Sequence, residues 1–131
     1  MPQPSAPWPQ EKRRNPRLEE KIPLKITSDL GDILTETKNL SCSGAYCRVS
    51  QRLEPMTRLR IHLLLPMRKN DKVTTKRITC QGIVVRVEAA ADSKDYFDTA
   101  IFFSDIAPKD TRNISEFIES VTNNKDHGKY N

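Results

Sequence analysis

Apolar and polar residues alternate with a period of two along most of the chain, which predicts β-strands. The clearest example is Leu59–Leu65, where every second residue is Leu or Ile. Five other segments alternate in the same way or are rich in strand-forming residues: Ile22–Ile26, Ile33–Lys38, Ala45–Val49, Lys76–Glu88 and Tyr96–Phe103. Six short strands separated by turns predict an antiparallel all-β fold.

Two positions predict departures from regular strands. Pro23 has no amide hydrogen to donate, so the first strand should begin at a sheet edge. In Lys76–Glu88 the apolar residues change face at Gly82, which predicts a β-bulge there. The segment Pro66–Thr75 is expected to be a polar connection between the fourth and fifth strands.

Near the carboxyl end the apolar period changes to that of a helix. Ile114, Phe117, Ile118 and Val121 are spaced as one face of an α-helix. Pro108 suits the first turn, where its missing amide hydrogen costs nothing. Strands followed by a single helix do not form a βαβ pattern, so we expect a barrel or a sandwich with the helix packed on it.

Composition divides the chain into a folded centre and two tails. Residues 1–11 are rich in proline and lack apolar periodicity, so we expect a flexible arm there. The folded domain should span residues 12–121, and residues 122–131 should form a flexible polar tail. No apolar run approaches the roughly 20 residues of a membrane span, and no secretory signal is visible, so a cytoplasmic protein is expected. Its three cysteines should then be reduced thiols.

Positive charge is concentrated in the first two thirds of the chain. Residues 1–87 contain 17 Lys and Arg against 8 Asp and Glu, whereas residues 88–131 contain 5 against 9. This imbalance suggests an anionic ligand, such as a nucleotide, a nucleic acid or a membrane surface. Ordinary solvated surface explains it equally well, so charge alone does not decide.

The sequence offers little for catalysis. His62 lies on a predicted strand among basic residues, His127 lies in the predicted tail, and neither has a Cys or Ser partner nearby in sequence. The spacing of Cys42, Cys47 and Cys80 lacks the paired CxxC of a structural zinc site. There is no phosphate-binding loop or dinucleotide fingerprint. We therefore expect no enzyme, no metal site and no cofactor.

Two short segments contain candidate binding residues, and the first is the basic run Lys12–Arg17 (KRRNPR) before the first strand. Pro16 favours an extended backbone there. Guanidinium groups bind phosphate oxygens bidentately, read the O6/N7 edge of guanine and stack on purines. Taken alone, the run is also compatible with a basic patch for solubility or non-specific nucleic-acid contact.

The second segment, Asn39–Gly44 (NLSCSG), leads into the third strand. In an extended backbone the Asn39 amide and the Ser41 hydroxyl face the same side, where they can hydrogen-bond a purine edge. Both are expected at a strand entrance, outside the core. Gly44 permits a positive φ or a close backbone approach. An ordinary polar turn is the alternative interpretation.

Taken in order, Arg13-x-x-x-Arg17 and Asn39-x-Ser41-x-x-Gly44 resemble the signature of the PilZ domain family. The resemblance extends over about residues 12–121, including the strands and the terminal helix. It implies a six-stranded antiparallel β-barrel that binds the bacterial second messenger cyclic di-GMP. The residues implied as ligand-binding are Arg13, Arg14, Arg17, Asn39, Ser41 and Gly44.

In that family the motif arginines hold phosphates and guanine edges, and the Asp/Asn and Ser bind the other side of a guanine. This sequence departs from the family pattern at Ala100, where many relatives have glycine, and it has Asn39 where others have Asp. The resemblance implies a non-enzymatic receptor whose linker Lys12–Leu18 closes on the barrel mouth when the ligand binds.

A stand-alone receptor of this kind must signal through a protein partner, here an unidentified one in motility, biofilm or exopolysaccharide control. We expect no nucleic-acid partner, no membrane span, and a monomer or weak homodimer. Two alternatives stay open. One is a basic barrel that binds single-stranded nucleic acid, with Tyr46 and Tyr96 as the available aromatic residues, and the other is a degenerate PilZ-like module that binds only protein.

Overall fold

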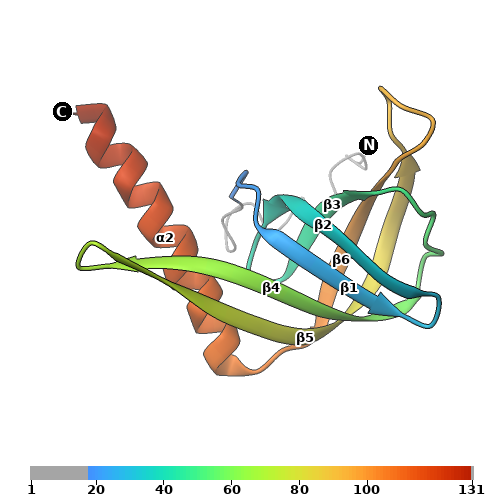
Figure 1. The fold of residues 1–131 in the computed structure, drawn as a ribbon, viewed down its shortest axis with the longest axis horizontal. Helices are drawn as coiled ribbons and strands as arrows, with labels where there is room; N and C mark the ends of the chain where they lie inside the picture. Colours follow the sequence, from blue (N-terminus) through green and yellow to red (C-terminus); the bar gives the residue numbers. More distant parts are fainter. Residues whose placement is uncertain (1–17, 131) are drawn as a thin grey trace, which may run out of the picture.

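Six antiparallel strands close into a barrel with one helix beside it in the computed structural model, which describes residues 18–130 (Figure 1). The elements are β1 (Pro23–Ser28), β2 (Gly31–Leu40), β3 (Gly44–Val49), β4 (Arg58–Lys69), β5 (Lys72–Ala89), β6 (Phe97–Asp105) and α2 (Pro108–Tyr130). Around the ring the strand order is β1-β2-β3-β6-β5-β4. The expected six-stranded antiparallel barrel with a carboxyl-terminal helix is therefore confirmed.

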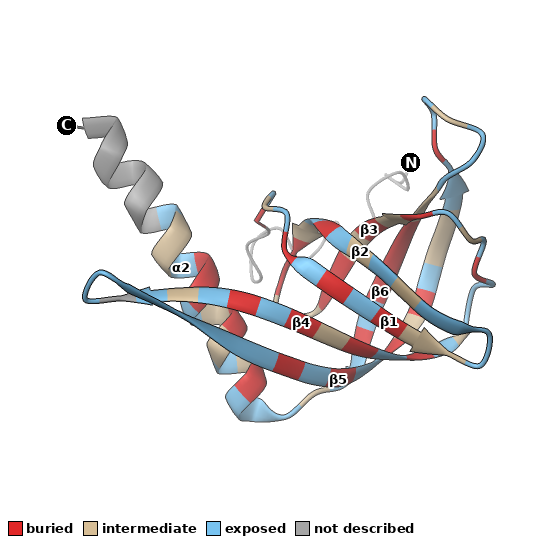
Figure 2. Cartoon of the chain, in the orientation of Figure 1, coloured by how far each residue is buried: buried red, intermediate tan, exposed pale blue. Residues whose placement is uncertain are grey.

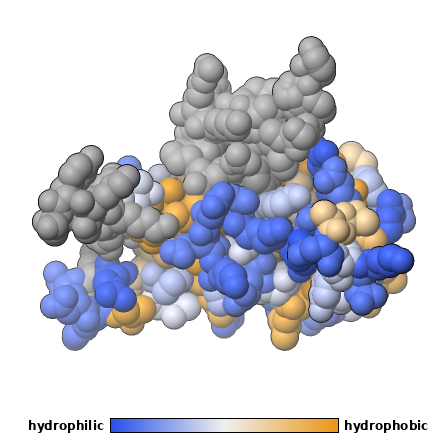
Figure 3. All heavy atoms as spheres, turned by 90° about the horizontal axis from the view of Figure 1, so that it is seen from above, coloured by the Kyte–Doolittle hydropathy of each residue, from blue (hydrophilic) through white to orange (hydrophobic). Residues whose placement is uncertain are grey.

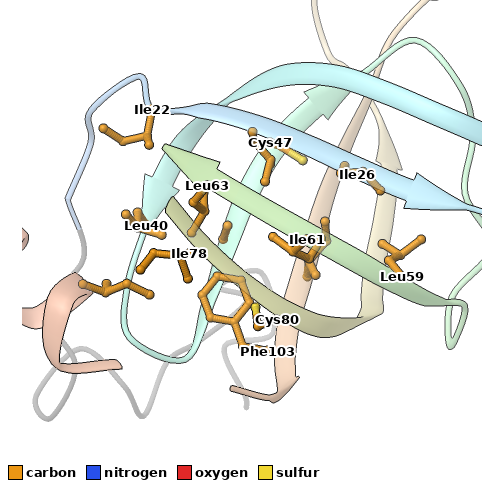
Figure 4. Close-up of a cluster of buried hydrophobic side chains, with 14 of the residues drawn as sticks. Ile22, Ile26, Leu40, Cys47, Leu59, Ile61, Leu63, Ile78, Cys80 and Phe103 are labelled. Carbon is orange, nitrogen blue, oxygen red and sulfur yellow. The ribbon is translucent and has the colours of Figure 1, made fainter. Parts of the chain in front are cut away.

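The period-two pattern places alternate side chains inside the barrel. Buried and exposed residues alternate along β1 and β4 (Figure 2). Ile26, Ile61, Leu63 and Ile78 have no exposed surface. These side chains converge with others from several strands in one cluster (Figure 4). Burial of this apolar surface is the main favourable term in folding.

Helix α2 packs against β4 and β5 and closes part of the core (Figure 1). Ile114, Phe117 and Ile118 are buried in the same cluster as the strand residues, as their spacing predicted. α2 continues past Val121 to Tyr130, through most of the segment 122–131 that was expected to be a tail. The segment after Val121 is polar but contains no proline, and most of its residue types cost a helix less than about 0.7 kcal/mol each.

The expected connection between the fourth and fifth strands is mostly strand. β4 runs to Lys69 and β5 starts at Lys72, so only two residues join them. Asn70 and Asp71 have φ values of 52° and 64°, as a type I′ hairpin turn requires. Pro66 is tolerated within β4 because β1 pairs with β4 only as far as Leu63, which leaves a free edge beyond that point.

Gly82 lies at a register shift between β5 and β6, but the extra residue there is Ser104 of β6. The extra residue on β5 is Val85, at a second shift. The inward face of β5 therefore changes after Val84 rather than at Gly82. The apolar pattern predicted a bulge at Gly82, three residues before its actual position on β5. The prediction missed the position because Gly82 faces the core but has no side chain to show this in the pattern.

The described surface is mostly polar. Seen from above, hydrophilic side chains cover most of it, with separate hydrophobic patches among them (Figure 3). Among residues 18–130, no helix has the length and apolar character needed to cross a membrane.

Candidate functional site

The predicted ligand residues divide into two groups. Those that the structure describes are Asn39, Ser41 and Gly44. Those outside the described residues are Arg13, Arg14 and Arg17. Leu18, the first described residue, directly follows Arg17. Its position therefore shows whether the two predicted motifs can lie close together.

Leu18 forms an isolated antiparallel bridge with Leu40. The Leu18 amide donates to the Leu40 carbonyl at 2.8 Å, and the Leu40 amide donates to the Leu18 carbonyl at 2.9 Å. Both side chains are buried in the core. Because Leu40 lies between Asn39 and Ser41, the arginine-bearing segment joins the barrel directly beside the second motif.

Thr37 of β2 holds the residues after Leu18, Glu20 and Ile22, against this strand. Its hydroxyl donates to the Glu20 carbonyl at 2.7 Å and accepts from the Ile22 amide at 3.1 Å. Its own amide donates to the Ile22 carbonyl at 2.9 Å. Nothing in the sequence distinguishes Thr37 from the other residues of a Thr-rich strand, so this anchor could not be predicted.

Asn39 lies on the outer face of the barrel. The register between β2 and β3 shifts between Thr37 and Asn39, and Asn39 then pairs with Tyr46. The next pair, Leu40 with Ala45, faces the core. Asn39 is half-buried, so part of its side chain is accessible from outside.

Ser41 lies in the turn that leads into β3, as expected, but it is not outside the core, because it has no exposed surface. Its hydroxyl accepts from the Ser43 amide at 3.2 Å and lies 3.4 Å from the Gly44 carbonyl, to which it can donate. Its amide donates to the same carbonyl at 2.9 Å. Ser41 therefore holds the turn between β2 and β3 together.

Gly44 begins β3 and is buried. It pairs with Phe102 of β6. A positive φ was one expected reason for this glycine, but among the described glycines only Gly31 has one, at 119°. The other expected reason for a glycine at position 44, a close approach of the backbone to the ligand, stays a prediction.

A row of side chains beside Asn39 forms a second part of this outer face. Tyr46 of β3 pairs with Ala100 of β6, and Ala100 pairs with Arg86 of β5. Ala100 is fully buried, although its position in the register faces outward. The ammonium of Lys38 lies 5.8 Å from the centre of the Tyr46 ring, within cation–π range.

Burial raises the pKa of the Tyr46 phenol, and the negative charges of Asp98 and Glu88 raise it further. The phenol is therefore a neutral hydrogen-bond donor at physiological pH. Neither Tyr46 nor Arg86 was predicted to bind cyclic di-GMP, and Tyr46 was named only as an aromatic residue available to the nucleic-acid alternative. In the sequence, only the alternation of polar and apolar residues within each strand indicated that these side chains face outward. Alternation does not show which strands are neighbours in the barrel.

A groove of about 860 Å³ runs beside residues 19–21 and β2, and the described part of its wall is rich in acidic side chains. Four acidic side chains line it: Glu19, Glu20, Glu36 and Asp92. Two of its cations, Lys38 and Arg48, are paired with Asp98 at 3.6 and 3.0 Å. Of the predicted ligand residues that the structure describes, Asn39, Ser41 and Gly44, none is in its wall.

Residues 18–130 contain no cluster of His, Cys, Asp or Glu side chains that could hold a metal ion. The thiols of Cys47 and Cys80 are buried, and burial raises the pKa of each to about 12. Such thiols are protonated and poorly nucleophilic.

Comparison with known proteins gives a family match and several structural matches. A model described as the PilZ domain matches residues 11–120. The Bacillus subtilis inhibitor of motility, MotI/DgrA, has a TM-score of 0.75 at 20% identity over 86% of this chain and 52% of that one. The K. pneumonia MrkH–c-di-GMP complex has a TM-score of 0.66 at 17% identity, covering 88% and 55%.

The PilZ domain of YcgR from Escherichia coli with c-di-GMP has a TM-score of 0.60 at 14% identity, covering 89% of this chain and 96% of that one. This chain spans about half the length of the first two solved structures. No match was found among the curated proteins. At these identities the structural matches show a shared fold.

Proposed function

Because this chain belongs to the PilZ domain family, which is typically a non-catalytic receptor domain, we propose that it is a receptor for cyclic di-GMP. The Leu18–Leu40 bridge is the observation that supports this most directly. It joins the segment with the arginine motif to β2 between Asn39 and Ser41. Two of the structurally similar proteins are described with c-di-GMP, which supports the choice of ligand.

In this proposal Arg13 and Arg17 bind the phosphates and guanine edges, and Arg14 contacts the ligand or a second ligand molecule. Asn39 binds the other side of a guanine from the outer face of β2. Ser41 can do so only if its hydroxyl leaves the contacts that it makes in the turn. Gly44 provides room for the backbone to approach.

The row of Tyr46, Ala100 and Arg86 extends the proposed site across β3, β6 and β5. A guanine ring over Ala100 would contact the flat faces of the Tyr46 phenol and the Arg86 guanidinium. Ala100 has no exposed surface, so the ring can lie over it only if the groups that cover it move when the ligand binds.

Leu18, the last residue of the expected linker, is already bridged to Leu40, so ligand binding would order the rest of the linker, Lys12–Arg17, against the barrel. Lys12–Arg17 and Lys21 contain five like charges, which repel one another until an anion neutralises them. Part of the interaction energy is used in ordering the backbone, so we expect an affinity in the low-micromolar range or tighter, equivalent to about −8 kcal/mol. The ordered linker would then pass the signal to a protein partner.

Isothermal titration calorimetry with cyclic di-GMP tests the proposal, with GTP and a short single-stranded oligonucleotide as competitor arms. Arg17→Ala should weaken binding by about 2–3 kcal/mol, or roughly 30- to 150-fold, because a charge-assisted bidentate contact is lost. Asn39→Ala should weaken it without changing the unfolding temperature, since Asn39 lies outside the core.

Arg52→Ala is a matched control, because Arg52 is an exposed arginine paired with Glu54 in a loop away from β2. It should leave the affinity unchanged. Undiminished affinity of Arg17→Ala would remove the motif assignment. Tighter binding of the oligonucleotide than of cyclic di-GMP would favour the nucleic-acid alternative.

A further inference from the structure

A second charged surface lies on the outer face of β1, β4 and β5. The register places Lys25 beside His62, Thr27 beside Arg60, and Leu64 beside Arg77. Arg58 is two residues before Arg60 on the same face of β4. We call this surface the basic face and define it as Lys25, Arg58, Arg60, His62 and Arg77.

The basic face has more positive charge than its neighbours neutralise. Lys25 lies 3.5 Å from Asp32. Arg58, Arg60 and Arg77 are exposed and form no ion pair with any residue in the described part of the chain. An exposed guanidinium without an ion pair can bind an external anion through its N–H donors.

The surroundings of His62 show the same surplus of positive charge. Partial burial lowers the pKa of the imidazole, and the charges of Lys25, Arg60 and Arg77 lower it further. Only Asp32 opposes them. The imidazole is therefore surrounded by cations from three strands.

An apolar hollow of about 420 Å³ lies within this surface. Pro23, Leu34 and Leu64 supply its apolar walls, and Lys25, His62 and Arg77 supply its polar ones. Leu34 is 78% exposed and Leu64 is 37% exposed, so together they present apolar surface to solvent at the hollow. An apolar centre with a charged rim is the common anatomy of a protein–protein interface.

We propose that the basic face docks an acidic segment of a partner protein that inserts one apolar side chain between Leu34 and Leu64. Its carboxylates would pair with the free guanidinium groups of Arg58, Arg60 and Arg77. A single-stranded nucleic acid fits less well, because none of the described side chains that line the hollow is aromatic and could stack on a base. A membrane fits less well, because insertion into lipid needs apolar side chains on a convex surface. This inference goes beyond the proposed ligand site and does not depend on it.

Selection from a library of random peptides displayed on phage tests the docking surface. The wild-type chain should enrich peptides in which Asp and Glu flank a Leu or Phe. Binding should be at least about tenfold weaker to the double variant Arg60→Glu/Arg77→Glu. Amide shifts on adding an enriched synthetic peptide should be confined to the residues around the hollow.

Two further variants separate charge from shape. Lys94→Glu/Lys109→Glu changes the net charge equally at exposed positions elsewhere, and it should bind the peptide as wild type does. Leu34→Ser keeps the basic face and removes an exposed apolar wall, so it should weaken binding without lowering the unfolding temperature. The proposal is overturned if no acidic peptide is enriched, if the Arg60→Glu/Arg77→Glu variant binds equally well, or if a single-stranded oligonucleotide or anionic vesicles displace the peptide.

Discussion

At the scale of single residues, His62 offers a direct measure of the electrostatic field on the outer face of the barrel. Burial and three neighbouring cations lower the pKa of its imidazole below the usual 6.5. An NMR titration should therefore give a midpoint below 6.5, and Arg77→Gln should raise that midpoint. Thr79→Ala, which removes a weak contact to the ring at 3.4 Å, is a control that changes no charge.

The sign of the effect on stability follows from linkage. A group whose pKa is lower in the folded than in the unfolded state stabilises the fold above its unfolded pKa and less so as pH falls. As the pH falls from about 7 to the lowered pKa of the folded protein, His62 should therefore decrease the unfolding temperature. His62→Gln should make this decrease smaller. An equal decrease in both proteins would show that other groups cause the pH dependence.

The three thiols should differ in reactivity. Cys47 and Cys80 are buried with pKa values raised to about 12, whereas Cys42 is half-buried and its pKa is raised mainly by that burial. Since the thiolate is the reactive form, a disulfide reagent at mildly alkaline pH should modify Cys42 first. Cys47 and Cys80 should react only on unfolding. Mass spectrometry of the peptides identifies the modified thiol, and early labelling of Cys80 would contradict the buried position.

At the scale of elements, Gly82 allows β5 to approach β6 closely. An alanine Cβ at this position would lie 2.7 Å from Ile101 Cγ2 and 3.2 Å from Ile61 Cγ1, both in the core. Gly82→Ala should therefore destabilise the protein by about 1–3 kcal/mol, measured by urea unfolding. Gln81→Ala, at the exposed neighbouring position, should change stability by less than about 0.5 kcal/mol. Equal effects of the two would mean that the core relaxes to accept the methyl group.

The number of strands, the closing helix and its buried face could all be predicted, because burial imposes a period on the sequence. The ends of elements could not. The Asn70–Asp71 turn has no glycine, although a type I′ turn favours Asn-Gly, so the hairpin was interpreted as a longer connection. The extension of the helix beyond Val121 could not be predicted, because the sequence after Val121 shows no apolar period.

The Asn39–Gly44 motif of the candidate site could be predicted from the sequence, whereas the row of Tyr46, Ala100 and Arg86 could not. Asn39, Ser41 and Gly44 were recognised from a motif, yet the burial of Ser41 follows from hydrogen bonds within its turn, which no spacing reveals. The row of Tyr46, Ala100 and Arg86 depends on β3, β6 and β5 being neighbours. That is a property of the strand order in the closed barrel, and residues about 50 apart in sequence meet only there.

At the scale of the whole molecule, ligand binding should act on the segment that precedes the barrel. Hydrogen exchange of the amides from Arg13 to Arg17 should slow when cyclic di-GMP is added, because ordering protects them. The Leu18 amide should already be protected without ligand, since it donates to the Leu40 carbonyl at 2.8 Å. Strong protection of the whole segment in the free protein, unchanged by ligand, would mean a preformed site and a switch elsewhere.

The strand order has a consequence for how the chain can be divided. β1-β2-β3 and β4-β5-β6 are two meanders, each continuous in sequence, and only the β1–β4 and β3–β6 pairings join them. A cut between the exposed residues Glu54 and Pro55 leaves each meander whole, and Met56 stays bonded to Val84 within the second piece. The two pieces should reassemble when mixed, as a split protein. Such a pair would turn the proposed ligand binding across the β3–β6 pairing, and the proposed docking across the β1–β4 pairing, into a readable association of two polypeptides.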